Sequence, residues 1–140
     1  MAISFFFQDT QIHLSERKRL KAFIAWMFKA KGKGLQSLNY IFCTDDYLLD
    51  INRKFLKHDY YTDIITFNLS DDKGEAQGEI YISVDRVREN ARMVKATLKK
   101  ELHRIIFHGA LHLCGYTDKT KAQKDRMTAE ENRYLSKYLP

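Results

Sequence analysis

Short apolar segments of strand-like composition alternate with longer segments of helical spacing, and this alternation limits the possible folds more than any other feature of the chain. Four segments rich in β-branched and aromatic side chains predict strands at residues 3–7, 38–43, 62–69 and 79–84. Helical spacing predicts five helices, at residues 16–31, 45–56, 85–96, 97–115 and 120–138. We therefore expect an α/β (α+β) fold with a single small mixed β-sheet of about four strands, flanked by about five helices.

Polar residues and glycines mark where several of these helices begin and end. Three predicted helices start after residues that favour the N-cap position, which are Ser15, either Thr44 or Asp45, and Asp85. Gly32 and Gly34 are expected to end the first helix, and Gly115 the fourth. The polar run at residues 70–78 predicts a loop within one domain and not a linker between two.

The chain has the size and composition of one compact hydrolase-sized domain that spans residues 1–140. It is 44% hydrophobic and 13% aromatic, with no compositional break along its 140 residues. Cys43 and Cys114 each lie in an apolar segment, which is typical of buried thiols in a reducing compartment. The first residues lack a basic leader and no segment has membrane-spanning length, so we expect a cytoplasmic protein without a membrane partner.

The charge balance favours a polyanionic partner. The formal net charge is +6 and the isoelectric point is about 9.3. Such an excess is typical of nucleic-acid-binding proteins, although it does not by itself identify one.

Two histidines, His108 and His112, lie one helical turn apart in the fourth predicted helix. They are separated by about 6 Å along the axis and about 40° around it, so both imidazoles can reach one metal ion. Cys114 lies about 200° around from His112 and is expected in the core. His103 lies about 180° around and is expected on the surface or at a cap. A purely structural histidine pair is the alternative.

Asp118 can complete a three-ligand site. The turn at Gly115 lets the chain fold back, so that Asp118 returns toward His108 and His112. In the alternative interpretation Asp118 only caps the last helix. The glutamate that directly follows the first histidine in zinc-protease helices is replaced here by Gly109, so that base is absent from this chain.

The segment "HGALHLCGYTD" resembles the signature of the YbeY family of bacterial endoribonucleases, His-Gly-x-Leu-His-Leu-x-Gly-Tyr-Asp-His. Two more segments, "INRKFLKHDYYTDIITF" and "GEIYISVDRVRENA", are similar to other blocks of that family. The resemblance implies a metal-dependent, single-strand-specific endoribonuclease that acts in maturation of ribosomal RNA, at the 3′ end of 16S rRNA, and in ribosome quality control. It further implies one zinc ion per chain, and ribosomal RNA with the small ribosomal subunit as partners.

Two positions depart from the family pattern. The third histidine of the signature falls at Asp118, so the expected ligands are His108, His112 and Asp118, a set that zinc accepts. The family arginine thought to contact RNA phosphate falls at Leu56, which leaves Arg53 and Lys57 as the nearest cations.

Four cations are candidates for RNA binding: Arg53, Lys57, Arg86 and Arg88. Arg86 and Arg88 fall in the first turn of a predicted helix, where the helix dipole disfavours positive charge, and this placement favours a polyanion in front of them. An ordinary solvated helix face is the alternative for all four. His58, Thr62 and Asp63 are further candidates for orienting ligands or RNA, although Asp63 can instead bond only to backbone.

Three protein ligands leave one metal position for water, which is typical of catalytic zinc. The expected catalytic group is thus a metal-bound water held by His108, His112 and Asp118, with no general base assigned. Two other functions remain open. A zinc-dependent peptidase or small-molecule hydrolase would use the same water, and a non-catalytic ribosome-assembly factor would hold a purely structural metal.

Overall fold

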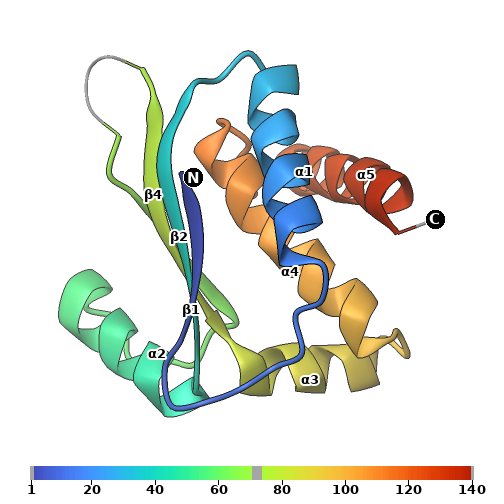
Figure 1. The fold of residues 1–140 in the computed structure, drawn as a ribbon. Helices are drawn as coiled ribbons and strands as arrows, with labels where there is room; N and C mark the ends of the chain where they lie inside the picture. Colours follow the sequence, from blue (N-terminus) through green and yellow to red (C-terminus); the bar gives the residue numbers. More distant parts are fainter. Residues whose placement is uncertain (1, 71–73, 140) are drawn as a thin grey trace.

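The computed structural model describes residues 2–70 and 74–139, and these contain one four-stranded mixed sheet (Figure 1). The strands are β1 (Ile3–Phe7), β2 (Leu35–Cys43), β3 (Ile64–Asn68) and β4 (Ala76–Ser83). Their order across the sheet is β1-β2-β4-β3, in which β1, β2 and β4 are parallel and β3 is antiparallel to β4. The predicted mixed sheet of about four strands is confirmed.

Five α-helices surround this sheet within the described residues. They are α1 (Arg17–Ala30), α2 (Asp45–Ile51), α3 (Val84–Met93), α4 (Leu98–Leu113) and α5 (Lys121–Tyr138). In Figure 1, α1 and α4 lie on one side of the sheet with α5 beyond them, and α2 lies on the other side. One further turn, the π-helix η1 (Asn52–Leu56), continues directly from α2. The predicted helix number and the α+β class are confirmed.

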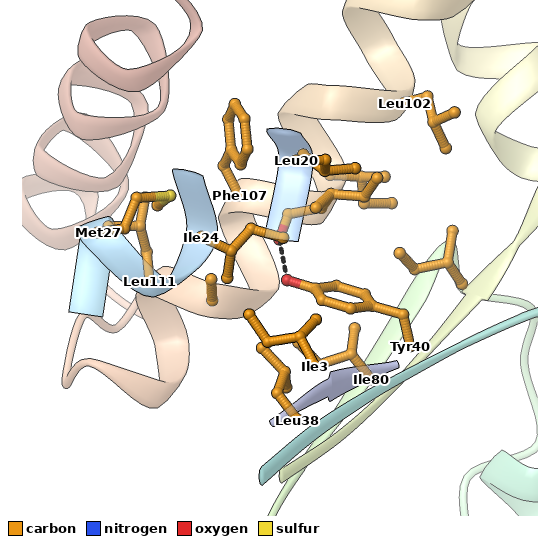
Figure 2. Close-up of a cluster of buried hydrophobic side chains, with 14 of the residues drawn as sticks. Ile3, Leu20, Ile24, Met27, Leu38, Tyr40, Ile80, Leu102, Phe107 and Leu111 are labelled. Carbon is orange, nitrogen blue, oxygen red and sulfur yellow. Dashed lines mark hydrogen bonds between the residues drawn. The ribbon is translucent and has the colours of Figure 1, made fainter. Parts of the chain in front are cut away.

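The core lies between the sheet and the helices α1 and α4, where apolar side chains from all three interdigitate (Figure 2). The hydroxyl of Tyr40 on β2 is fully buried and donates a hydrogen bond of 2.8 Å to the backbone oxygen of Ile106 on α4. A buried hydroxyl without a partner would be costly, so this bond joins the middle of the sheet to the middle of α4.

Two glycines allow α4 to lie close to the sheet. A Cβ atom at Gly109 of α4 would lie 2.8 Å from Cδ1 of Ile80 and 3.2 Å from Cδ1 of Ile64. A Cβ atom at Gly78 of β4 would lie 2.6 Å from Cδ1 of Leu113. Real side chains do not approach so closely, so both contacts require glycine, and position 109 faces the sheet.

Three of the helix starts have the expected kind of cap. The side chain of Thr44 accepts the backbone N–H of Tyr47, and Thr97 accepts that of Lys100. Thr120 begins α5 with a capping box that includes Gln123. For α2, the choice between Thr44 and Asp45 is thereby decided in favour of Thr44.

Two predicted caps are wrong. Ser83, and not Asp85, caps α3, because β4 passes into this helix without a loop and Ser83 Oγ accepts the N–H of Arg86. Asp85 lies in the first turn of α3 and instead accepts the backbone N–H of Asp45, 2.8 Å away. The N-cap position of α1 is Glu16, in left-handed conformation and without a side-chain cap bond, so Ser15 lies outside the helix.

Several strand boundaries differ from the prediction. The strand β4 begins at Ala76 because its pairing with β2 and β3 extends into the polar run expected to be a loop. Residues 71–73 of that run lie outside the described part of the chain. The strand β2 begins three residues earlier than expected, at Leu35, and β3 is shorter than expected at both ends.

His103 is buried, at 2% exposure, so its predicted surface position is wrong. It does lie on the side of α4 away from His112, but that side is covered by aromatic residues of α1 and α5. Its ring stacks on Tyr138 with ring centres 5.2 Å apart, and its Nδ1 lies 2.7 Å from the backbone oxygen of Lys99. Burial lowers the pKa of His103.

No helix in residues 2–70 or 74–139 combines the length and the apolar character needed to cross a membrane.

The close approach of α4 to the sheet can be tested at Gly78. Replacement Gly78→Ala is expected to lower the free energy of unfolding by about 1–3 kcal/mol, because the added methyl group overlaps Leu113 and lies 3.1 Å from the backbone oxygen of Phe67. Urea denaturation measures the change. Gly34→Ala is the matched control, since its methyl group would meet only the exposed chain of Glu75, at 3.2 Å. Equal losses in the two variants would contradict the close packing.

Candidate metal centre

Three side chains, those of His108, His112 and Asp118, converge at the C-terminal half of α4. Their candidate ligand atoms all lie within 4.8 Å of one another. The two Nε2 atoms are 3.0 Å apart, and each lies 3.4 Å from Oδ2 of Asp118. The structure therefore brings together the three residues predicted as metal ligands.

The turn after α4 returns the chain to the histidines. Gly115 has a φ of 104°, a left-handed value that favours glycine, and its N–H bonds to the backbone oxygen of His112. The next residue, Tyr116, donates its N–H to the oxygen of Leu111. These bonds close a tight turn, and Asp118 follows it at the level of the histidine rings. The predicted role of Gly115 is confirmed.

A buried ion pair holds this turn in place. Nζ of Lys31, at the end of α1, donates to the hydroxyl of Tyr116 at 2.8 Å and to Glu130 of α5 at 2.7 Å. The Tyr116 hydroxyl also donates to Glu130, at 2.9 Å. Burial opposes both charges, but these bonds outweigh it, so the pKa of Lys31 is raised and that of Glu130 is lowered. The turn is thus tied to two helices.

The second ring nitrogen of each histidine has its own acceptor. His108 Nδ1 lies 2.6 Å from Oε2 of Glu131, and His112 Nδ1 lies 2.9 Å from the backbone oxygen of Tyr116. A carbonyl oxygen can only accept, and a carboxylate also accepts, so both Nδ1 atoms carry the proton. The lone pairs of both neutral rings are then on Nε2, directed at one another and at Asp118.

This donor set fits a metal ion. Two imidazole lone pairs and one carboxylate oxygen face a common point, and such acceptors repel one another unless a cation or a proton lies between them. Histidine nitrogen and carboxylate oxygen are both ligands of zinc. The bonds from Nδ1 to Glu131 and to the Tyr116 carbonyl are the supporting contacts usual around metal-bound histidine. Burial opposes protonation of His108, but Glu131 outweighs it and raises the pKa of this histidine.

The three side chains lie in the wall of an open cavity of about 590 Å³ between α4 and β3. One side is formed by the segment before β3 and by its outward-facing residues, Thr62, Asp63, Ile64, Thr66 and Asn68. The opposite side is formed by α4 and by Glu131 of α5. The hydroxyl of Thr66 is buried without a hydrogen-bond partner among the described residues. A strand and a helix thus form a groove beside the histidines.

The cavity has an acidic end opposite Asp118. Burial raises the pKa of Asp63, which accepts a hydrogen bond of 3.2 Å from Asn90, and burial also raises the pKa of Glu101. Arg104 is the one arginine or lysine among the described lining residues. It donates to Glu131 at 3.1 Å and lies 3.9 Å from Glu101. Its side chain remains 26% exposed toward the cavity.

The four cations predicted to bind RNA lie outside this lining. Arg53 pairs with Asp59 at 2.5 Å, and Lys57 follows η1 on the surface. Arg86 forms two bonds of 3.1 Å to the carboxylate of Asp45. Arg88 donates to the backbone oxygen of Gln11, on another part of the surface.

Three other predicted positions can now be located. Leu56, where the family pattern has arginine, ends η1 and is 40% exposed, outside the cavity. Thr62 and Asp63 do line the cavity, whereas His58 lies on the surface and pairs with Tyr60. Cys114 packs against the main core and does not line the cavity, as expected, and burial raises the pKa of its thiol to about 11.

Sequence reasoning missed two residues of this centre, Arg104 and Glu131. Arg104 lies four residues before His108 and therefore on the same side of the helix, which is a usable signal. Glu131 follows His108 by 23 residues on another helix, and only the packing of α5 against α4 brings them together.

Comparisons with known proteins agree with this architecture. The model of a family described as "Endoribonuclease YbeY" matches residues 5–139. The chain is 50% identical to the endoribonuclease YbeY of Cytophaga hutchinsonii, over 96% of this chain and 94% of that one. It is 40% identical to the endoribonuclease YbeY of Parabacteroides distasonis, over 97% and 95%. A solution structure of a Thermotoga maritima protein is similar with a TM-score of 0.66 at 28% identity, covering 96% of this chain and 87% of that one.

The role of Glu131 as a supporting contact can be measured. Glu131→Gln is expected to weaken metal affinity about 10- to 100-fold, because the amide binds the Nδ1 proton of His108 less strongly than a carboxylate does. Competition with a chromogenic chelator gives the affinity. Glu130→Gln is the matched control, since Glu130 is the adjacent residue but bonds to Lys31 and Tyr116. The control should retain metal affinity and lose thermal stability, and equal metal affinities in both variants would contradict the role of Glu131.

Proposed function

The chain belongs to the YbeY family of endoribonucleases, and from this premise we propose that it is a zinc-dependent endoribonuclease that cleaves single-stranded RNA. One domain, residues 1–140, would carry the activity. His108, His112 and Asp118 would hold one zinc ion. The observation that carries the proposal is the convergence of three metal-ligand acceptors, without a hydrogen-bond donor between them, in the wall of an open cavity.

Zinc bound by three protein ligands supplies a Lewis acid that polarises a phosphoryl oxygen and lowers the pKa of a water ligand to about 7. The chain itself supplies the remaining contacts. Arg104 presents N–H groups to the cavity and is oriented by Glu131, so it can stabilise the charge that develops on a phosphate there. Asp63 and Glu101, whose pKa values burial raises, are the cavity carboxyl groups suited to carry a proton to or from the reacting oxygens.

Position 109 argues against the zinc-peptidase alternative. The helix of such enzymes carries its base glutamate directly after the first histidine. In this chain that position points at Ile80 and Ile64 of the sheet, where even a methyl group does not fit. A glutamate at position 109 could not reach the cavity.

The cavity argues against a purely structural metal. Structural zinc sites are closed by four protein ligands, and the candidate group among the described residues has three. The side chain of Asp118 is 40% exposed and faces an open groove. That groove gives a substrate access to the fourth position.

The substrate and the setting follow from the family. We propose ribosomal RNA as the substrate, the small ribosomal subunit as the partner, and the cytoplasm as the place of action. The formal charge of +6 supports a polyanionic substrate.

A cleavage assay tests the central proposal. Purified protein is expected to cleave unstructured RNA, to leave duplex RNA intact, and to lose activity with a chelator. His112→Ala should lose bound metal and cleavage together, whereas Cys114→Ala should keep both, because Cys114 packs against the core. Metal analysis and gel electrophoresis of labelled RNA give the two readouts. Peptide hydrolysis with inert RNA would refute the proposal.

Asp118 provides a sharper test of the ligand set. Asp118→Ala should lose metal and activity, and Asp118→His should retain both, because imidazole can replace the carboxylate on zinc. Wild-type protein should accept manganese more readily than Asp118→His does, since carboxylate oxygen suits the harder ion. Calorimetric metal titration measures both effects. Zinc affinity of Asp118→Ala equal to that of wild type would show that the third ligand lies elsewhere.

A further inference from the structure

Three aromatic side chains are exposed on the segment that leads into the cavity wall. Phe55 is 64% exposed, Tyr60 52% and Tyr61 48%. Tyr61 directly precedes Thr62 and Asp63, which line the cavity. Exposed aromatic rings concentrated in so short a segment mark an interaction surface. We call Phe55, Tyr60 and Tyr61 the aromatic platform.

Cationic residues are interleaved with the aromatic platform. Arg53, Lys54 and Lys57 lie in the same segment, with Asp59 as its only acid, and Asp59 pairs with Arg53. Lys54 and Lys57 form no ion pair within residues 2–70 and 74–139. The platform therefore has a net positive charge, which suits a phosphodiester backbone better than an apolar protein surface.

The tyrosine rings are held in place from one side. The ring of Tyr60 stacks on His58 with centres 5.2 Å apart, and its hydroxyl lies 3.0 Å from His58 Nδ1. Its backbone oxygen accepts a bond of 2.9 Å from the buried side chain of Asn52. Half of the Tyr60 residue is nevertheless exposed, so a ring face remains accessible to a planar ligand.

Tyr61 is fixed in a similar way. Its hydroxyl donates to Asp46 at 3.2 Å, and the guanidinium of Arg86 lies 5.1 Å from its ring centre. Arg86 thus belongs to this surface, although its charge is already paired with Asp45. Rings that are held before binding lose little conformational freedom when a base stacks on them.

We propose that the aromatic platform binds unpaired bases of single-stranded RNA by stacking, next to the phosphate that enters the cavity. The proposal rests on the proposed RNA cleavage and names the residues that select the substrate. Every base offers a flat face, so stacking is tolerant of sequence. In a duplex those faces are already stacked on neighbouring bases, so the platform favours single strands.

The experiment measures binding apart from cleavage. A fluorescent, unstructured RNA oligonucleotide is titrated into the His112→Ala protein, which should leave the RNA intact, and anisotropy gives the affinity. A second oligonucleotide of the same length has abasic ribose in place of the nucleosides. Adding Tyr60→Leu is expected to weaken binding of the base-containing RNA about 5- to 100-fold, and to leave abasic binding unchanged.

Two matched variants control for side effects. Tyr60→Phe keeps the ring and should retain the affinity for RNA. Trp26→Leu removes another exposed aromatic residue, on α1 and outside the cavity lining, and should also retain it. Thermal unfolding of each variant reports its folding.

Two results would overturn the proposal. If Tyr60→Leu leaves RNA affinity unchanged, the platform serves another partner, such as a protein. If it weakens RNA and abasic binding equally, Tyr60 does not contact bases. Cleavage by wild-type protein is assayed separately, so absent cleavage with base-dependent binding refutes the nuclease proposal alone, and normal cleavage with unchanged binding refutes the platform alone.

Discussion

The close contact between α4 and the sheet determines the geometry of everything near the histidines. Without a side chain at Gly109, the helix approaches Ile80 and Ile64 directly. The bond from Tyr40 to the backbone of Ile106 joins the two layers at the preceding turn of α4. Once one side of a helix is set against a sheet, its 3.6-residue period decides where every other side chain points. His108 and His112 consequently face β3 across a groove and are not buried beneath it.

Two adjacent glutamates of α5 divide the work of holding the candidate site. Successive helical residues point about 100° apart, so Glu130 and Glu131 reach different neighbours. Glu130 ties Lys31 and Tyr116 together and so secures the turn that carries Asp118. Glu131, buried and paired with Arg104, accepts the Nδ1 proton of His108. Buried ion pairs add little net stability, so their main contribution here is a fixed position for the candidate ligands.

Local patterns predicted most of the fold and the ligand group, whereas contacts between distant segments had no local signal. Strands and helices followed from composition and period, and the return of Asp118 followed from Gly115. The caps at Ser15 and Asp85 were wrong because a left-handed residue and a strand that passes directly into a helix cannot be recognised from residue type. His103 was wrong because its helix face meets aromatic residues of two other helices. Glu131 could not be found, since only tertiary packing brings it to His108.

The distribution of charge explains why substrate binding would need a surface outside the cavity. Four carboxyl groups line the cavity, those of Asp63, Glu101, Asp118 and Glu131, against the single arginine Arg104 among the described residues. A cavity of this composition attracts a cation and, by itself, repels a phosphate backbone. The net charge of +6 must therefore be carried elsewhere on the protein. In the proposed mechanism, a bound metal reverses the local charge and the platform before β3 holds the flanking nucleotides. Affinity gained away from the reacting phosphate can then offset the cost of bringing that phosphate among carboxylates.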